Sequence, residues 1–176
     1  MLIRLPVVVL ALGLLVVSLP GCSGDPGTGP VEVKWDRVAC ERCRMVLSDR
    51  RHAAQIRFTD PGGKSRIMFF DDIGCAVIWL DDKPWKDAAG TEIWVNDHRD
   101  GRWIDARKAY YVEGGLTPME YGLGAQDEPA AGAMSFEQAI ARIWEIEKRF
   151  NRHGADVREQ SRPRGGDAPA ITEHRH

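Results

Sequence analysis

Cysteine is scarce in this sequence, and several familiar signatures are missing. Four cysteines among 176 residues are too few for a fold held together by disulfides, and acidic and basic residues nearly balance at 26 against 24. That balance indicates no basic face for nucleic acid. No long apolar run follows the N-terminal segment, so no membrane-spanning core is expected. Nucleophile elbows, phosphate loops and dinucleotide fingerprints are also missing, and nothing apart from the cysteines points to an enzyme.

The N-terminus has the pattern of an export signal. Residues 5–19 are almost entirely apolar and follow a single positive charge, in a run too short for a comfortable membrane-spanning helix. The run ends in LPGC at 19–22, which resembles the cleavage box of bacterial lipoproteins. The resemblance implies a signal peptide over 1–21, cleavage before Cys22 and lipidation of its sulfur. An ordinary signal followed by a chance cysteine is the alternative.

Composition divides the rest of the chain into a tether, one domain and a tail. Residues 22–30 are rich in Gly and Pro, so we expect a flexible, lipid-anchored tether. Residues 31–153 carry the strand and helix patterns of a folded domain. From residue 154 the chain is polar and offers few side chains to a core, which predicts a disordered tail over 154–176.

The first part of the domain predicts two strands followed by a helix. Segment 31–38 alternates loosely and is expected to be a short strand. Segments 53–59 and 65–70 flank a Pro-Gly-Gly turn and predict a hairpin. An aspartate at 71 or 72 can then cap a helix that continues to Leu80 and is apolar nearly all round, so this helix should be deeply buried.

A similar pattern follows in the second part. Segments 91–95, 103–105 and 109–113 are strand-like. Ser135 opens a capping box for an amphipathic helix. We therefore predict an α+β fold of two small ββαβ-like units, each a strand–strand–helix repeat with antiparallel or mixed sheets, although the two halves share no obvious sequence identity.

The sharpest local signal is the run CERCRM at 40–45. Cys40 and Cys43 have a spacing that lets two thiols point at one ion, and Met45 adds a thioether. Thiolate and thioether sulfurs are soft ligands that favour Cu(I), whereas zinc normally takes four ligands, often from two such cysteine pairs. Met119, in a loop punctuated by Pro and Gly, is a candidate third ligand, although filling the core would explain it equally well.

Other interpretations of the cysteines remain open. Cys-x-x-Cys is also the thioredoxin-type redox motif, and an exported pair can form a structural disulfide. Cys75 lies within the apolar helix, where a free cysteine often behaves as a small buried hydrophobe. Arg42 and Arg44 lie beside the pair, and their positive charge is expected to favour thiolate.

Three segments in order resemble the NosL family, the nitrous oxide reductase accessory lipoproteins. The run at 40–45 resembles the family's Cys-x-x-Cys-Gly-Met signature, FFDDIGC at 69–75 its second stretch and TPMEYGLGA at 117–125 its third. The resemblance covers about residues 38–150. Arg44 stands where the family has glycine, which allows positive φ, so the substitution bears on the loop geometry and on the charge beside the ion.

The resemblance implies a function as well as a fold of paired ββαβ units. It implies a membrane-anchored lipoprotein facing the periplasm, at the outer membrane of a Gram-negative host, that binds Cu(I). Its partner would be the nitrous oxide reductase apoprotein, whose copper–sulfide cluster receives the copper. The family's soft ligands fall on Cys40, Cys43, Met45 and Met119, with Cys75 as a further candidate. We expect a copper chaperone with a site open on one side, and a thiol–disulfide redox protein as the alternative.

Overall fold

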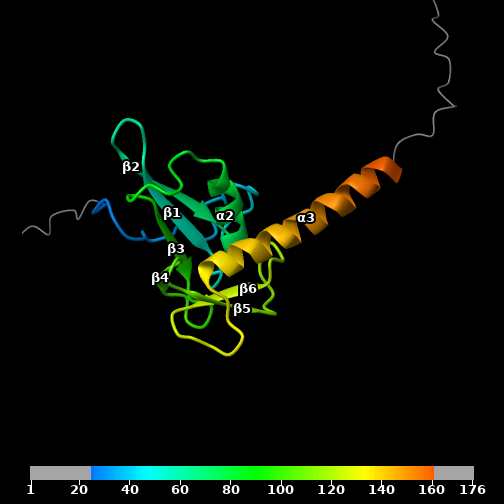
Figure 1. Ribbon diagram of the computed structural model, residues 1–176. Helices are drawn as coiled ribbons and strands as arrows, with labels where there is room; N and C mark the ends of the chain where they lie inside the picture. Colours follow the sequence, from blue (N-terminus) through cyan, green and yellow to red (C-terminus); the bar gives the residue numbers. More distant parts are fainter. Residues whose placement is uncertain (1–24, 161–176) are drawn as a thin grey trace, which may run out of the picture.

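The computed structural model describes residues 25–160 of the chain. Within them, six strands and two helices follow one another in the order β1-β2-α2-β3-β4-β5-β6-α3 (Figure 1). None of the described helices is both long and apolar enough to span a bilayer. The predicted signal peptide over 1–21, the predicted lipidation site at Cys22 and residues 161–176 of the predicted tail lie outside the described residues.

Four strands form one antiparallel sheet in the order β2-β1-β3-β4. Their bounds are Ala54–Thr59 for β1, Ser65–Phe70 for β2, Glu92–Asn96 for β3 and Trp103–Asp105 for β4. The helix α2, Ile73–Asp81, follows β2 and packs on the sheet (Figure 1). The predicted hairpin and helix are thus confirmed, and β1-β2-α2-β3 is a ββαβ unit.

A second, smaller sheet pairs β5, Tyr110–Glu113, with β6, Leu123–Gln126, and is followed by α3, Phe136–Gln160. The α+β class with antiparallel sheets is confirmed. The sequence pattern does not predict β6, because glycine weakens a strand pattern. Position 124 needs glycine, because the ring of His98 packs on its backbone and an added Cβ would lie 2.8 Å from the ring.

Both helices begin where the sequence predicts. The carboxylate of Asp72 accepts a hydrogen bond from the Gly74 amide at 2.8 Å and caps α2. At α3 the Ser135 amide donates to the Gln138 side chain at 2.8 Å and the Gln138 amide donates to the Ser135 hydroxyl at 3.4 Å, which completes the expected capping box. The helix continues to Gln160, so residues 154–160 are helical and not part of a disordered tail.

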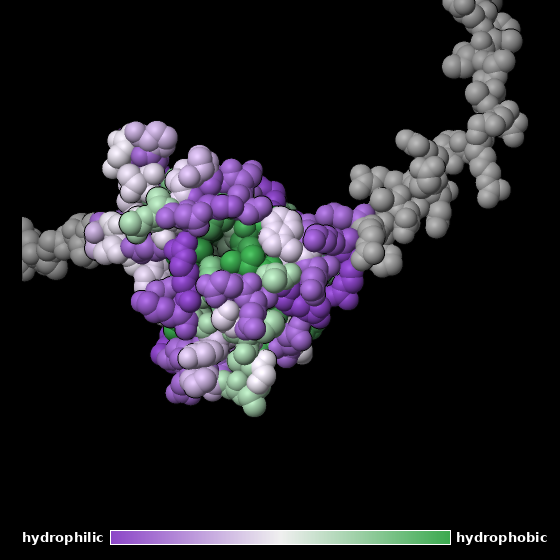
Figure 2. Space-filling model, viewed as in Figure 1, coloured by the Kyte–Doolittle hydropathy of each residue, from purple (hydrophilic) through white to green (hydrophobic). Residues whose placement is uncertain are grey.

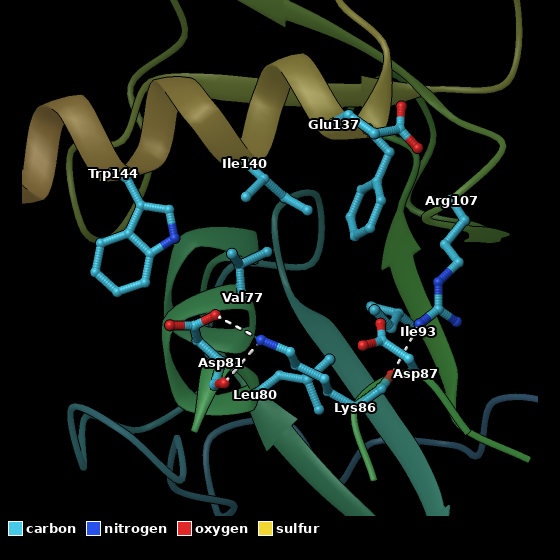
Figure 3. A pocket seen from close by; sticks show the side chains of 11 residues that line it. Val77, Leu80, Asp81, Lys86, Asp87, Ile93, Arg107, Glu137, Ile140 and Trp144 are labelled. Carbon is cyan, nitrogen blue, oxygen red and sulfur yellow. Dashed lines mark hydrogen bonds and ion pairs between the residues drawn. The ribbon is translucent and has the colours of Figure 1, made fainter. Parts of the chain in front are cut away.

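The main core lies between the four-stranded sheet and the helices. Phe58 of β1 stacks on Trp85 with ring centroids 4.0 Å apart, and Phe70 of β2 lies 5.3 Å from Trp79 of α2. Between α2 and the first turns of α3 a hollow of about 370 Å³ opens to solvent, visible as an apolar patch inside a polar rim (Figure 2). Apolar side chains of both helices face this hollow, and the ion pair of Lys86 with Asp81 lies at its edge (Figure 3).

The segment before β1 packs against polar side chains of the sheet. Gln55 and Arg57 alternate along β1 with the residues that face α2, so they point to the other face. Gln55 exchanges two hydrogen bonds with the backbone of Val31, at 3.0 and 2.8 Å. Arg57, which is 2% exposed, donates to the Gly29 carbonyl at 2.8 Å and to both carboxylate oxygens of Asp25 at 2.9 and 2.7 Å.

These contacts correct two predictions about the N-terminal side of the domain. Residues 25–30 are held by hydrogen bonds to the sheet, so the expected flexibility of the tether over 22–30 is wrong for this part. The Gly/Pro-rich segment buries no apolar side chain, but it supplies hydrogen-bond acceptors to the buried guanidinium of Arg57. Segment 31–38 is not a strand either, because Asp36 adopts a φ of 61° and turns the chain towards Leu47.

Candidate metal centre

The three segments that carry the sequence motifs meet at one place in the fold. The amide of Glu41 donates to the Phe69 carbonyl at 2.8 Å and joins the loop at 40–45 to the end of β2. The ring of Tyr121 lies directly on Gly74, where an added Cβ would be 2.2 Å from a ring carbon. The loop before β6 therefore packs on the first turn of α2, and only glycine leaves room for it.

Four side chains that could hold a metal ion gather where these segments meet. The sulfurs of Cys40, Cys43 and Cys75 and a carboxylate oxygen of Asp71 all lie within 4.8 Å of one another. Cys40 and Cys75 have no exposed surface, and Asp71 is 3% exposed. Cys43 is partly exposed, so this four-residue centre reaches the surface at Cys43. The three thiols are free.

The loop that holds the first two cysteines keeps a glycine-like backbone. Arg44 adopts a φ of 66°, the left-handed conformation that glycine takes most readily. Around it the Cys40 amide donates to the Met45 carbonyl at 2.7 Å, and the Arg44 amide donates to the Cys40 carbonyl at 3.1 Å. The side chain of Arg44 is 69% exposed and pairs with Glu41. Arg44 therefore strains the loop, because its Cβ lies in a backbone region that favours glycine.

The three thiols differ sharply in acidity. A hydrogen bond from the Cys75 thiol, helped by backbone amides, lowers the pKa of Cys40 to about 6. Burial and the Asp71 carboxylate raise the pKa of Cys43 to about 12. The pKa of Cys75 is also raised, chiefly because its thiol donates a hydrogen bond to Cys40 and because it is buried. Cys40 is therefore the thiol of the centre that ionises most readily.

Comparison with known protein families shows to which family the chain belongs. The model of the NosL family matches residues 30–137, which include all four residues of the centre. The chain belongs to the NosL family. No curated protein and no solved structure gives a match.

One arginine links the centre of this NosL chain to α3. The guanidinium of Arg42 lies 3.8 Å from the sulfur of Cys75, 3.2 Å from the Tyr121 hydroxyl and 2.7 Å from a carboxylate oxygen of Glu147. The hydroxyl of Tyr121 donates to the other oxygen of Glu147 at 2.7 Å. Glu147 lies beyond the matched region and 105 residues from Arg42, so no local signal in the sequence could have indicated it.

The prediction that arginines favour thiolate is met only in part. Arg42 lowers the pKa of Cys75, but the hydrogen bond that Cys75 donates to Cys40 and the burial of Cys75 raise it by more. Arg44 points to the surface, where it pairs with Glu41. The acidity of Cys40 comes instead from hydrogen bonds that it accepts.

The donor set fits a soft or borderline metal ion. Three thiols supply soft ligands, and Asp71 adds one hard oxygen. The sequence allows either Asp71 or Asp72 to cap the helix, but only Asp72 caps α2, which leaves Asp71 for the centre. Met45 is 46% exposed and Met119 packs against the core at the loop before β6. Coordination by these two methionines stays a prediction.

Proposed function

We propose that this NosL protein binds Cu(I) at its thiol centre and delivers it for assembly of the copper–sulfide cluster of nitrous oxide reductase. The observation that carries the proposal is the gathering of Cys40, Cys43 and Cys75 within 4.8 Å. Three thiolates at this spacing suit Cu(I), which prefers soft sulfur ligands and accepts low coordination numbers. The chain then acts as a metallochaperone and not as an enzyme.

The partly exposed Cys43 supports transfer rather than storage. A partner's sulfur can reach an ion at this edge while Cys40 and Cys75 still hold it from the buried side. Met45 lies beside this edge in sequence and is 46% exposed, so its thioether can contribute during loading or release. Exchange of ligands one at a time avoids a step in which the ion has no partner.

The acidities argue against the thiol–disulfide alternative. A redox thiol needs an accessible thiolate as its nucleophile. Here the acidic Cys40 has no exposed surface, while the accessible Cys43 has a pKa raised to about 12. The Cys-x-x-Cys run also lies in a turn and does not open a helix.

We infer the location from the N-terminal segment and the family. Lipidation of Cys22 would anchor the chain to the outer membrane and present the domain to the periplasm. Asp25 is hydrogen-bonded to the sheet, so the domain begins within three residues of that anchor. The partner is the nitrous oxide reductase apoprotein, as the family relationship suggests.

The first test is an anaerobic competition titration with the chromophoric Cu(I) chelator bicinchoninate. The reduced chain carrying Cys22→Ser is compared with the same chain carrying Cys40→Ser and Cys43→Ser, or Met119→Leu. We expect one tightly bound Cu(I), lost in the cysteine variant and weakened in the methionine variant. Met134→Leu is the matched control, because Met134 pairs with Tyr111 of β5 and is not one of the candidate ligands.

Failure of the unsubstituted chain to compete for Cu(I) would contradict the proposal. Delivery is tested next, by mixing the copper-loaded chain with nitrous oxide reductase apoprotein and following the transfer of copper to the apoprotein with time. Free Cu(I) at the same concentration is the control. Equal rates from both sources would argue against a delivery role.

A further inference from the structure

One carboxylate oxygen in the centre has no partner in the described part of the chain. Asp71 is 3% exposed, and its Oδ1 is buried without a hydrogen bond. The other oxygen, Oδ2, accepts a hydrogen bond from the Cys43 thiol, with 3.1 Å between oxygen and sulfur. A buried carboxylate with an unsatisfied oxygen is costly and calls for an explanation, of which a bound ion is one.

Cu(I) does not explain this carboxylate. Cu(I) is a soft ion that the three thiolates satisfy, and a hard carboxylate oxygen adds little to it. A borderline divalent ion such as Zn²⁺ differs, because it takes four ligands in a tetrahedron and accepts sulfur and carboxylate oxygen together. A divalent ion also leaves one negative charge fewer on the buried donors than Cu(I) does.

We propose that Asp71 completes a four-ligand site, with Cys40, Cys43 and Cys75, that binds Zn²⁺ or a similar divalent ion in place of Cu(I). The four donor atoms lie within 4.8 Å of one another, and the ligands of a tetrahedral zinc ion are separated by distances of that order or somewhat less. This inference deepens the proposed function and rests on its premise that the cluster is a metal centre.

The two ions then use the same sulfurs in different ways. With Cu(I) the carboxylate stays outside the coordination sphere, and the partly exposed Cys43 remains open to a partner. With Zn²⁺ the carboxylate of Asp71 takes the fourth position, closes the site and slows release, because a complete tetrahedron leaves no vacant position for an incoming ligand. Asp71 is thus the residue that distinguishes the two ions.

The test measures both ions on the full chain carrying Cys22→Ser and kept in solution with detergent. Zn²⁺ is titrated against a chromophoric chelator, and Co²⁺ is added as a spectroscopic substitute. We expect one Zn²⁺ per chain and the intense visible bands of four-coordinate Co²⁺. Asp71→Asn should weaken Zn²⁺ binding by at least about 10-fold, since even outer residues of zinc sites have effects of this size. Its Cu(I) affinity, measured with bicinchoninate, should stay within about twofold.

Asp72→Asn is the matched control, because Asp72 is a buried neighbour that caps α2, and asparagine is an equally good cap. It should leave both affinities unchanged. An unchanged Zn²⁺ affinity in Asp71→Asn, or the weak bands of six-coordinate Co²⁺ in the unsubstituted chain, would overturn the inference. Loss of both ions in Asp71→Asn would overturn it too, because the carboxylate would then shape the loop and not select an ion. Failure of Cu(I) binding alone would contradict the proposed function and leave the Zn²⁺ results as a separate outcome.

Discussion

At the scale of single residues, Arg44 is the strained residue of the loop at 40–45. Its φ of 66° places a Cβ in a backbone region that favours glycine, and its side chain gains only an exposed ion pair with Glu41. The loop therefore holds this conformation at a cost in stability, and the charge of Arg44 lies at the surface beside the Cys43 edge.

Arg44→Gly should stabilise the protein by roughly 0.5–1 kcal/mol, because the left-handed strain of about 1–2 kcal/mol is partly offset by the greater freedom of glycine in the unfolded chain. Urea unfolding of the metal-free, reduced chain measures this difference. Arg44→Ala is the control, since it removes the ion pair but keeps the Cβ. A gain of the same size in Arg44→Ala would mean that charge, not backbone strain, is responsible.

The acidity of Cys40 gives a second prediction at this scale. Thiolate absorbance of the chain carrying Cys22→Ser should show one thiol that ionises near pH 6, well below the ordinary value of 9, with the other two protonated through pH 9. Cys75→Ala should move the pKa of Cys40 upwards, because Cys75 donates the hydrogen bond that lowers it most. A first ionisation that stays near pH 6 in Cys75→Ala would assign the effect to the backbone amides instead.

At the scale of elements, the segment at 25–31 acts as an added layer on the sheet. It is short of apolar side chains, yet it covers Arg57 and Gln55 with backbone carbonyls and the carboxylate of Asp25. Polar satisfaction holds it in place where hydrophobic burial would otherwise be needed. A lipid anchor at Cys22 would therefore attach to a fixed part of the domain.

Arg57→Ala should destabilise the protein by about 2 kcal/mol, because it removes a buried aliphatic stem and leaves the Gly29 carbonyl without its donor. Amide hydrogen exchange at Gly29 and Val31 should become faster at the same time. Lys108→Ala is the control, since Lys108 belongs to an ion pair in which its own side chain is 84% exposed. It should change stability by no more than about 0.5 kcal/mol. Equal effects of the two substitutions would show that the segment is not held through Arg57.

At the scale of the whole molecule, the centre depends on packing between segments that are distant in sequence. Tyr121 lies on Gly74 and also contacts Arg42 and Glu147, so one side chain connects the loop before β6, the start of α2 and α3. This packing places Met119 and Cys75 in adjoining segments. The geometry of the metal centre should therefore respond to a change that touches no ligand.

Gly74→Ala should destabilise the fold by about 1–3 kcal/mol and weaken Cu(I) binding, because the new Cβ would lie 2.2 Å from the Tyr121 ring and push the loop away. Thermal unfolding and the bicinchoninate titration measure the two effects. Gly90→Ala is the matched control, since the nearest atom to its added Cβ is 3.8 Å away. Undiminished Cu(I) affinity in a destabilised Gly74→Ala would show that the loop is not needed for the centre.

The sequence by itself determined the local features of this NosL protein. The Cys-x-x-Cys run, the hairpin turn, the Asp72 cap and the Ser135 capping box each depend on residues a few positions apart, and their geometry follows from chain stereochemistry. The types of candidate ligand could therefore be predicted.

Only the tertiary structure decided which ligands meet. Cys75 and Asp71 are about thirty residues from Cys40 and Cys43, and Glu147 is 105 residues from Arg42, so their contacts come from the packing of α2 and α3 on the sheets. The fixed segment at 25–30 has the same origin, because a Gly/Pro-rich composition favours flexibility until a buried arginine requires its carbonyls. Periodicity in a sequence indicates which face of an element is buried, but the partner on that face is chosen by the shape and polarity of the assembled core.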